Sequence, residues 1–115
     1  MTNPSPDSLL PLAPATFHIL VSLAGADRHG YALIQDIAER TAGAVRLGAG
    51  TLYRTIQRLL EDGLIVELEE RPDPDEDDER RRYYRIAKLG RRVLQAETAR
   101  LSLLLDAARS KKVRA

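Results

Sequence analysis

Polar side chains suited to reading nucleic acid recur along one side of residues 47–65. At 100° per residue, a helix over this segment places Leu52, Ile56 and Leu59 on one apolar face. Arginine can bind guanine bidentately, glutamine can bind adenine, and other polar groups can hold phosphates. On the side of the helix opposite the apolar face, the side chains predicted to face DNA are Thr51, Tyr53, Arg54, Gln57 and Arg58. Tyr53 lies at the edge of this polar side.

Two other interpretations of this segment were open. A phosphate-binding loop at Gly48 and Gly50 lacks the spaced Gly-Lys-Ser/Thr motif, and no buried strand precedes it. An ordinary amphipathic helix with solvated charges is the commoner explanation for arginines on a helix face. The side-chain types, the position as third helix, and the basic residues Arg80 and Arg82 downstream favour a DNA-reading helix.

Catalytic and metal-binding chemistry finds little support. His18 and His29 do not have the spacing of a metal-binding pair, and no Ser-His-Asp set or paired carboxylates can be placed in a predicted pocket. The acidic stretch 73–79 lacks the glycine and spacing of an EF-hand calcium loop. We therefore predict neither an enzyme nor a metal or cofactor site.

The elements that must position the DNA-facing residues follow from hydrophobic periodicity and from glycine and proline punctuation. The predicted order is helices over 14–24, 31–43 and 48–63, strands over 64–70 and 80–87, and a last helix over 88–109. Residues 25–30 are expected to be a connector, and 45–47 a short extended piece. The first strand should alternate Leu64 and Val66 against Ile65, and the second Tyr84 and Ile86 against Tyr83.

This order predicts a mainly α fold with a small β-hairpin, the arrangement of a winged helix-turn-helix followed by a C-terminal helix. Four divisions are expected along the chain. They are a flexible N-terminal arm (1–13), the winged helix-turn-helix (14–87), a dimerisation helix (88–110) and a basic tail (111–115).

The charge of the predicted wing is uneven. Residues 67–79 hold nine of the 17 acidic residues and one of the 18 basic residues. The rest of the chain therefore has an excess of bases that the net charge of +1 hides. Because DNA repels carboxylates, the acidic tip should lie away from a duplex, while Arg80 and Arg82 at the base of the wing contact its backbone.

The last helix is apolar over about twice the width of an ordinary amphipathic stripe, so it should pack on its own domain and on a second copy. Glu97 and Arg100 fall within this arc and are hypothesised to pair across the interface. The interface residues predicted on this helix are Val93, Leu94, Leu101, Leu104, Leu105 and Ala108.

Length and composition restrict the remaining classes. A chain of 115 residues suits one small domain, and the absence of cysteine excludes disulfides and thiolate metal sites. The N-terminus lacks a basic region and a long apolar core, and no stretch approaches the ~20 apolar residues of a membrane span. We expect a cytoplasmic protein without a membrane partner.

Three segments in this order, HGYALIQDI, GAGTLYRTIQRLLEDGLI and RRYYRIAKLGRRVL, resemble the PadR family of bacterial transcriptional regulators. The resemblance implies a homodimeric repressor whose last helix packs on the partner's last and first helices, which adds Phe17 to the interface. It also implies a near-palindromic double-stranded DNA operator and release by a small-molecule effector. Tyr53 would contact DNA, and Tyr31 would serve DNA or the core. The wing pattern corresponds to Arg81, Arg82 and Tyr84.

The sequence also departs from the family pattern. Gly48-Ala49 replaces the usual Ser-Pro, and Ala87 replaces a threonine before the last helix, so a probable N-cap worth ~1 kcal/mol is missing. Some compact members of the family clamp aromatic drugs with a tryptophan in the last helix, but this chain has no tryptophan. The alternative function from another class is a winged-helix module that binds protein and does not read DNA.

Overall fold

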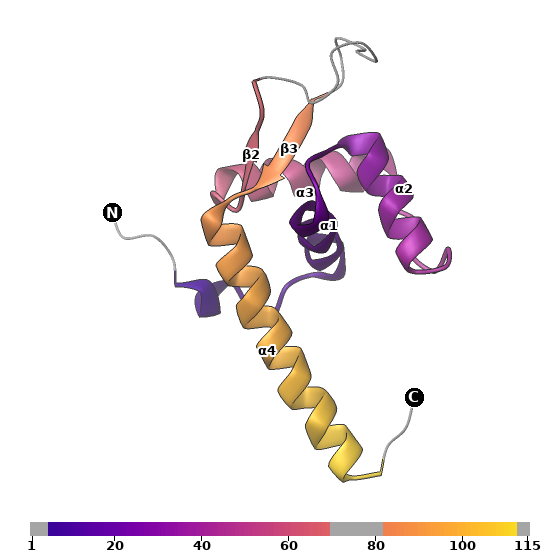
Figure 1. Ribbon diagram of the computed structural model, residues 1–115, viewed down its shortest axis with the longest axis vertical. Coiled ribbons are helices and arrows are strands. Elements are labelled where there is room, and N and C mark those ends of the chain that lie inside the picture. The colour runs from indigo at the N-terminus through magenta and orange to yellow at the C-terminus, as the bar shows by residue number, and fades with distance from the viewer. Residues whose placement is uncertain (1–4, 70–81, 113–115) are drawn as a thin grey trace.

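The computed structural model describes residues 5–69 and 82–112. The helices are η1 (Pro6–Leu9, a 3-10 turn), α1 (Pro14–Gly25), α2 (Gly30–Arg40), α3 (Ala49–Glu61) and α4 (Lys88–Ser110). The strands are β1 (Arg28–His29), β2 (Ile65–Glu67) and β3 (Tyr83–Ile86). The described chain is mainly helical with a small antiparallel sheet beside α3 (Figure 1), which confirms the predicted fold class.

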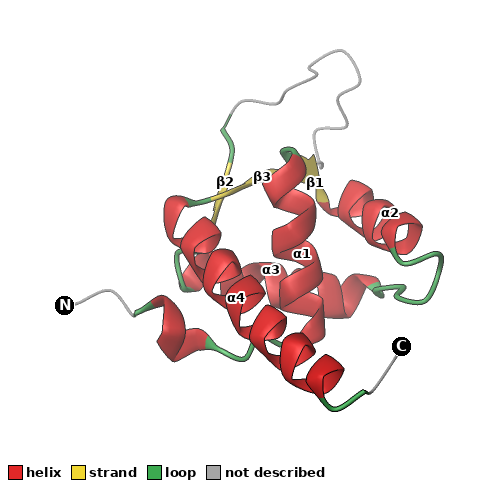
Figure 2. Cartoon of the chain, turned by 60° about the horizontal axis from the view of Figure 1, so that its bottom comes forward, coloured by secondary structure: helices red, strands yellow, loops and turns green. Residues whose placement is uncertain are grey.

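The core forms where α1 meets the other three α-helices (Figure 2). The apolar face predicted for α3 is confirmed, because Leu52, Ile56 and Leu59 are all buried. They pack in one cluster with residues of α1 such as Ile19 and Leu20. Each such side chain contributes roughly 1.5–3 kcal/mol when it leaves water, so this cluster fixes the rotation of α3 about its axis.

The sheet contains a strand that the sequence did not reveal. The connector predicted at 25–30 includes β1, and the strand order is β1-β3-β2 with Arg28 opposite Tyr84. The extended piece predicted at 45–47 is a loop instead. A two-residue strand has no readable period, so only pairing with β3 distinguishes β1 from a turn.

The alternation predicted for the first wing strand is wrong, whereas that of the second is confirmed. Leu64 and Ile65 are both buried and Val66 is exposed. Leu64 follows the end of α3 and is tied to it, because its amide donates to the Leu59 carbonyl just after Gly63, which has φ +74°. From Ile65, which lies opposite Ile86, the strand does not alternate either, because Val66 and Glu67 are both exposed.

The N-terminal segment is not a loose arm in the part that the structure describes. Residues 5–13 include η1, and Leu9, Leu10 and Leu12 pack against the core. The Leu12 amide donates a 2.8 Å hydrogen bond to Oε2 of Glu97 on α4. The prolines correctly indicated an irregular backbone. The prediction of a loose arm is wrong because the three leucines within this segment pack on the core.

Helix α4 has two different halves. Its first half packs on the domain through Gly90, Val93 and Glu97, and its second half extends away from the other helices (Figure 1). Val93 is fully buried in the chain's own core, so its predicted place in a dimer interface is wrong. The apolar arc of this helix is wide partly because the residues buried in the first half and the leucines exposed in the second half lie at different angles around the helix axis.

The hypothesis that Glu97 and Arg100 pair across an interface is also wrong. Both Nε and Nη2 of Arg100 donate to the Glu97 carboxylate within the same chain. A spacing of three residues on a helix brings the two side chains together without a partner chain.

A search of the described helices for a segment with the length and hydropathy of a membrane span finds none.

Candidate nucleic-acid interface

Helix α3 presents a polar surface opposite its buried stripe. The residues predicted to face DNA, namely Thr51, Tyr53, Arg54, Gln57 and Arg58, are all exposed. One straight helix holds them in a fixed relative arrangement, since the rotation of α3 is set by its buried leucines and isoleucine. The structure thus brings these residues together on one face.

Two of these side chains make only weak contacts within the helix. Gln57 Nε2 lies 3.3 Å from Glu61 Oε1, and Arg58 Nε lies 3.9 Å from Asp62 Oδ2. The Arg58 side chain is 80% exposed. Solvent-exposed pairs of this kind contribute about 0–1 kcal/mol, so both donors can turn to a ligand at little cost.

Tyr53 lies over the start of α2. A Cβ added at Gly30 would come within 2.6 Å of the Tyr53 hydroxyl oxygen, so the absence of a side chain at residue 30 makes room for the phenol. His29 caps α2, with Nδ1 accepting a 3.1 Å hydrogen bond from the Ala32 amide. Tyr31, in the first turn of α2, is exposed rather than in the core. Two tyrosines thus flank a helix N-terminus, where the macrodipole favours anions such as phosphate.

The wing, formed by β2 and β3, lies beside α3. Arg82 is exposed and its Nη1 lies 3.5 Å from Oε1 of Glu67 across the β2–β3 pair. Arg80 and Arg81, predicted at the same end of the wing, lie outside the described residues. Tyr84 belongs to the core, where burial and then Glu67 raise the pKa of its phenol. Its part in the wing is packing rather than surface contact.

A hollow of about 330 Å³ separates α3 from the wing. Its lining combines Tyr53, Gln57 and Leu60 of α3 with Glu67 of β2, Tyr84 of β3 and Arg82 just before β3. Of the side chains predicted to contact DNA, Tyr53, Gln57 and Arg82 therefore border this hollow.

A polar network that the sequence analysis missed joins α1 to α2. The hydroxyl of Ser22 donates to Asp36 Oδ2 at 2.6 Å, and Arg40 Nε donates to the same oxygen at 3.0 Å. Arg40 also reaches the His18 carbonyl at 3.0 Å, and Arg28 Nη2 lies 3.5 Å from Asp36 Oδ1. Burial opposes ionisation of Asp36, but hydrogen bonds from Ser22 and Arg40 outweigh it and leave the pKa of the carboxyl below its usual value. The i,i+4 spacing of Asp36 and Arg40 was the available sequence signal.

A second pair ties the turn after α1 to the wing. Arg85 on β3 binds Asp27 through two donors, Nη2 to Oδ2 at 2.8 Å and Nε to Oδ1 at 3.1 Å. The hydrogen bonding from Arg85 lowers the pKa of Asp27. These contacts join residues 58 positions apart, a separation at which sequence spacing carries no signal.

The residues predicted for a dimer interface lie in three settings. Phe17 and Leu94 are half-buried, while Leu101, Leu104 and Leu105 are exposed on the projecting half of α4, with Ala108 partly exposed beyond them. Among residues 5–69 and 82–112, no group of three or more His, Asp or Glu side chains could hold a metal ion.

Solved structures similar to this one include transcription regulators. The structure is similar to a PadR family transcription regulator from a hypervirulent Clostridium difficile, with TM-score 0.73 and 20% identity over 85% of this chain and 97% of that one. It is also similar to a PadR family transcriptional regulator from Eggerthella lenta, with TM-score 0.63 and 26% identity over 80% and 78% of the two chains. A transcriptional regulator from Clostridium thermocellum has TM-score 0.70 and 24% identity, covering 84% and 87%. Below 25% identity, such likeness speaks for the fold alone.

Sequence comparison extends the likeness. An uncharacterized protein from Lysinibacillus sphaericus is 37% identical over 68 residues, which span 59% of this chain and 60% of that protein's length. The family model described as the transcriptional regulator PadR-like family matches residues 19–96, from α1 well into α4. The chain therefore belongs to the PadR-like family, whose members are DNA-binding transcription regulators rather than enzymes.

Proposed function

We propose that this protein is a homodimeric repressor that places α3 in the major groove of a near-palindromic operator and is released by a small-molecule effector. The observation that carries the proposal is the joint exposure of five suitable side chains on α3, above a buried stripe that holds the helix rigid. Membership of a family of DNA-binding regulators supports the same function.

The side chains divide into two roles. Arg54 and Gln57, near the centre of the exposed arc, would bind base edges, with Thr51 and Arg58 beside them. Tyr53 of α3, which lies over the start of α2, would hold phosphates and set the register together with Arg80 and Arg82 of the wing. Salt would weaken all phosphate contacts, because each one releases counterions from the duplex.

A second copy would use the projecting half of α4. Leu101, Leu104 and Leu105 expose apolar surface that a partner's α4 and its Phe17 would cover. Two copies related by a twofold axis would present their α3 helices about 34 Å apart, one turn of DNA. The near-palindromic operator follows from this symmetry.

The test is fluorescence anisotropy with a duplex selected from a random pool, at two salt concentrations. Arg54→Ala should cost about 1–3 kcal/mol on the selected duplex and relax preference at one base position. Arg91→Ala, which removes an exposed arginine from α4, is the matched control. Binding that is absent at low salt, or that does not change with salt, would support the protein-interaction alternative instead.

A further inference from the structure

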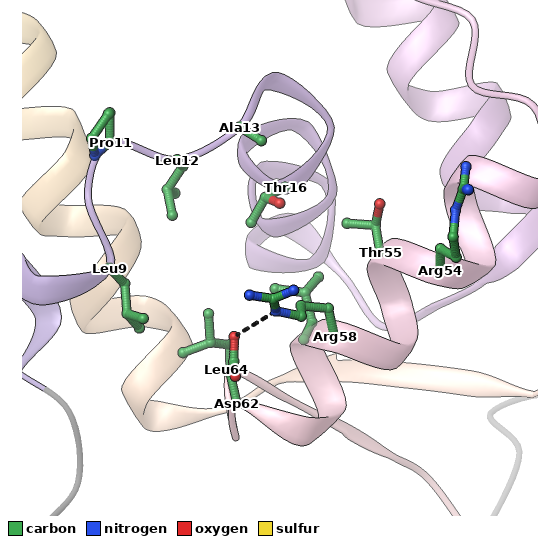
Figure 3. Close-up of a pocket in the computed structure, with 11 residues that line it drawn as sticks. Leu9, Pro11, Leu12, Ala13, Thr16, Arg54, Thr55, Arg58, Asp62 and Leu64 are labelled. Carbon is green, nitrogen blue, oxygen red and sulfur yellow. Dashed lines mark ion pairs between the residues drawn. The ribbon is translucent and has the colours of Figure 1, made fainter.

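A second hollow, of about 560 Å³, lies on the side of α3 away from the wing (Figure 3). The N-terminal segment contributes Leu9, Pro11 and Leu12, α1 contributes Thr16, and Arg58 and Leu64 come from α3 and the residues after it. Its volume falls within the range of about 300–1,000 Å³ that is typical of small-molecule sites.

The outer wall of this hollow is held in place. The Leu12 amide donates to the buried carboxylate of Glu97, and Leu9 and Leu12 pack on the core. The apolar walls are leucine, alanine and proline side chains, and no aromatic residue lines the hollow. Such walls can enclose a flexible alkyl chain, but they provide no ring on which an aromatic ligand would stack.

Two arginines, Arg54 and Arg58, line this aliphatic surface, and Figure 3 shows the Arg54 side chain turned away from it. Figure 3 shows the Arg58 guanidinium directed into the hollow toward Asp62 and Leu64. Its Nε is 3.9 Å from Asp62 Oδ2, beyond hydrogen-bonding distance, so guanidinium donors remain for a second anion. This planar fork binds a carboxylate or a phosphate through two parallel hydrogen bonds. Asp62 opposes a second negative charge, which favours a ligand with a single one.

We propose that this hollow binds a free medium-chain aliphatic carboxylate, with its tail between Leu9, Leu12 and Leu64 and its head group on Arg58. The bound anion engages the same guanidinium that the proposed function assigns to DNA. Ligand and operator then compete for Arg58, and this consequence rests on the proposed function. The binding site itself does not.

The test titrates the full chain, labelled with ¹⁵N, with octanoate or with the neutral 1-octanol, and follows backbone amide shifts. Octanoate should shift amides in 9–16 and 54–64 and bind about tenfold more tightly than octanol, since only the carboxylate can pair with the Arg58 guanidinium. Arg58→Gln should remove this tenfold difference. Arg91→Gln on α4 should keep it.

Three results would overturn the proposed site: equal affinity for the two probes, no saturable binding, or shifts confined to the exposed residues 101–105, which would mean adventitious amphiphile binding only. A parallel anisotropy titration separates the two proposals. Selective octanoate binding with no DNA binding under any condition would overturn the proposed function and support the ligand site. DNA binding with no octanoate binding would do the reverse.

Discussion

Gly90 decides how closely α4 can approach the wing. A Cβ at this position would lie 2.1 Å from the Leu64 carbonyl oxygen and 2.9 Å from Ile86 Cγ1. The same carbonyl accepts a 2.9 Å hydrogen bond from the Ala87 amide, so the backbone around residue 64 is held and cannot retreat. A close approach of backbone to backbone therefore requires glycine here.

Gly90→Ala should destabilise the fold by about 1–3 kcal/mol or more, because the added methyl group overlaps fixed backbone. Gly50→Ala is the matched control: that glycine lies within α3 and a Cβ there meets nothing within 4 Å. Alanine should stabilise this helix position by up to about 1 kcal/mol. Urea unfolding measures both changes. Equal stability of the two variants would show that α4 can shift to accommodate the methyl group.

At the scale of the element, α4 joins two surfaces that follow one another along its axis. Its first half is tied to the domain through Val93 and through Glu97, which also holds the N-terminal segment. Its second half exposes leucines that have no intrachain core to cover. At 100° per residue, Leu105 lies about 40° from Leu101, whereas Leu103 lies about 200° away on the opposite side.

Leu105→Glu should therefore dissociate the proposed dimer, because a buried unpaired carboxylate at an interface costs several kcal/mol. Leu103→Glu, a matched charge on the other side of the same exposed turn, should leave the dimer intact. Sedimentation equilibrium over a range of concentrations measures the two association constants. A wild-type chain that stays monomeric, or a larger effect at residue 103, would contradict the assigned face.

Across the whole molecule, three carboxylates fix elements that are distant in sequence. Asp27 ties the turn after α1 to β3, Asp36 ties α1 to α2, and Glu97 ties α4 to the N-terminal segment. Arg85 lowers the pKa of Asp27, and Arg100 together with the Leu12 amide lowers the pKa of Glu97. Asp36 also has a lowered pKa despite its burial.

The fold should consequently lose stability in acid. A carboxyl whose folded-state pKa lies below the unfolded value of about 4 binds fewer protons when folded, so lowering the pH favours unfolding. The contribution is complete above about pH 5 and is lost as the pH falls through 4 and below. The urea midpoint should drop between pH 7 and pH 3.

Asp36→Asn should make this drop smaller, because one of the linked carboxyls is gone. Asp106→Asn, on the exposed end of α4, provides a variant of the same chemistry away from the network. If the midpoint of the natural chain were unchanged between pH 7 and pH 3, these ion pairs would contribute no net stability.

The amino-acid sequence by itself determined the four α-helices, the buried stripe of α3 and the exposed face opposite it. Leu52, Ile56 and Leu59 repeat at helical spacing, and any helix with that pattern turns Arg54 and Gln57 outward. Gly63, at the end of the helix predicted over 48–63, likewise follows α3 with a positive φ. These features depend on residues within one or two turns of each other.

Tertiary structure alone decided the features that depend on contacts between distant residues. Strand β1 exists because Arg28 and His29 pair with β3, and residues 5–13 are ordered because Glu97, 85 positions from Leu12, accepts its amide. Val93 is another example: it was predicted to lie in the dimer interface, but it is buried in the chain's own core. Local periodicity predicts which side chains are buried, but it does not predict which part of the protein or of a partner packs against them.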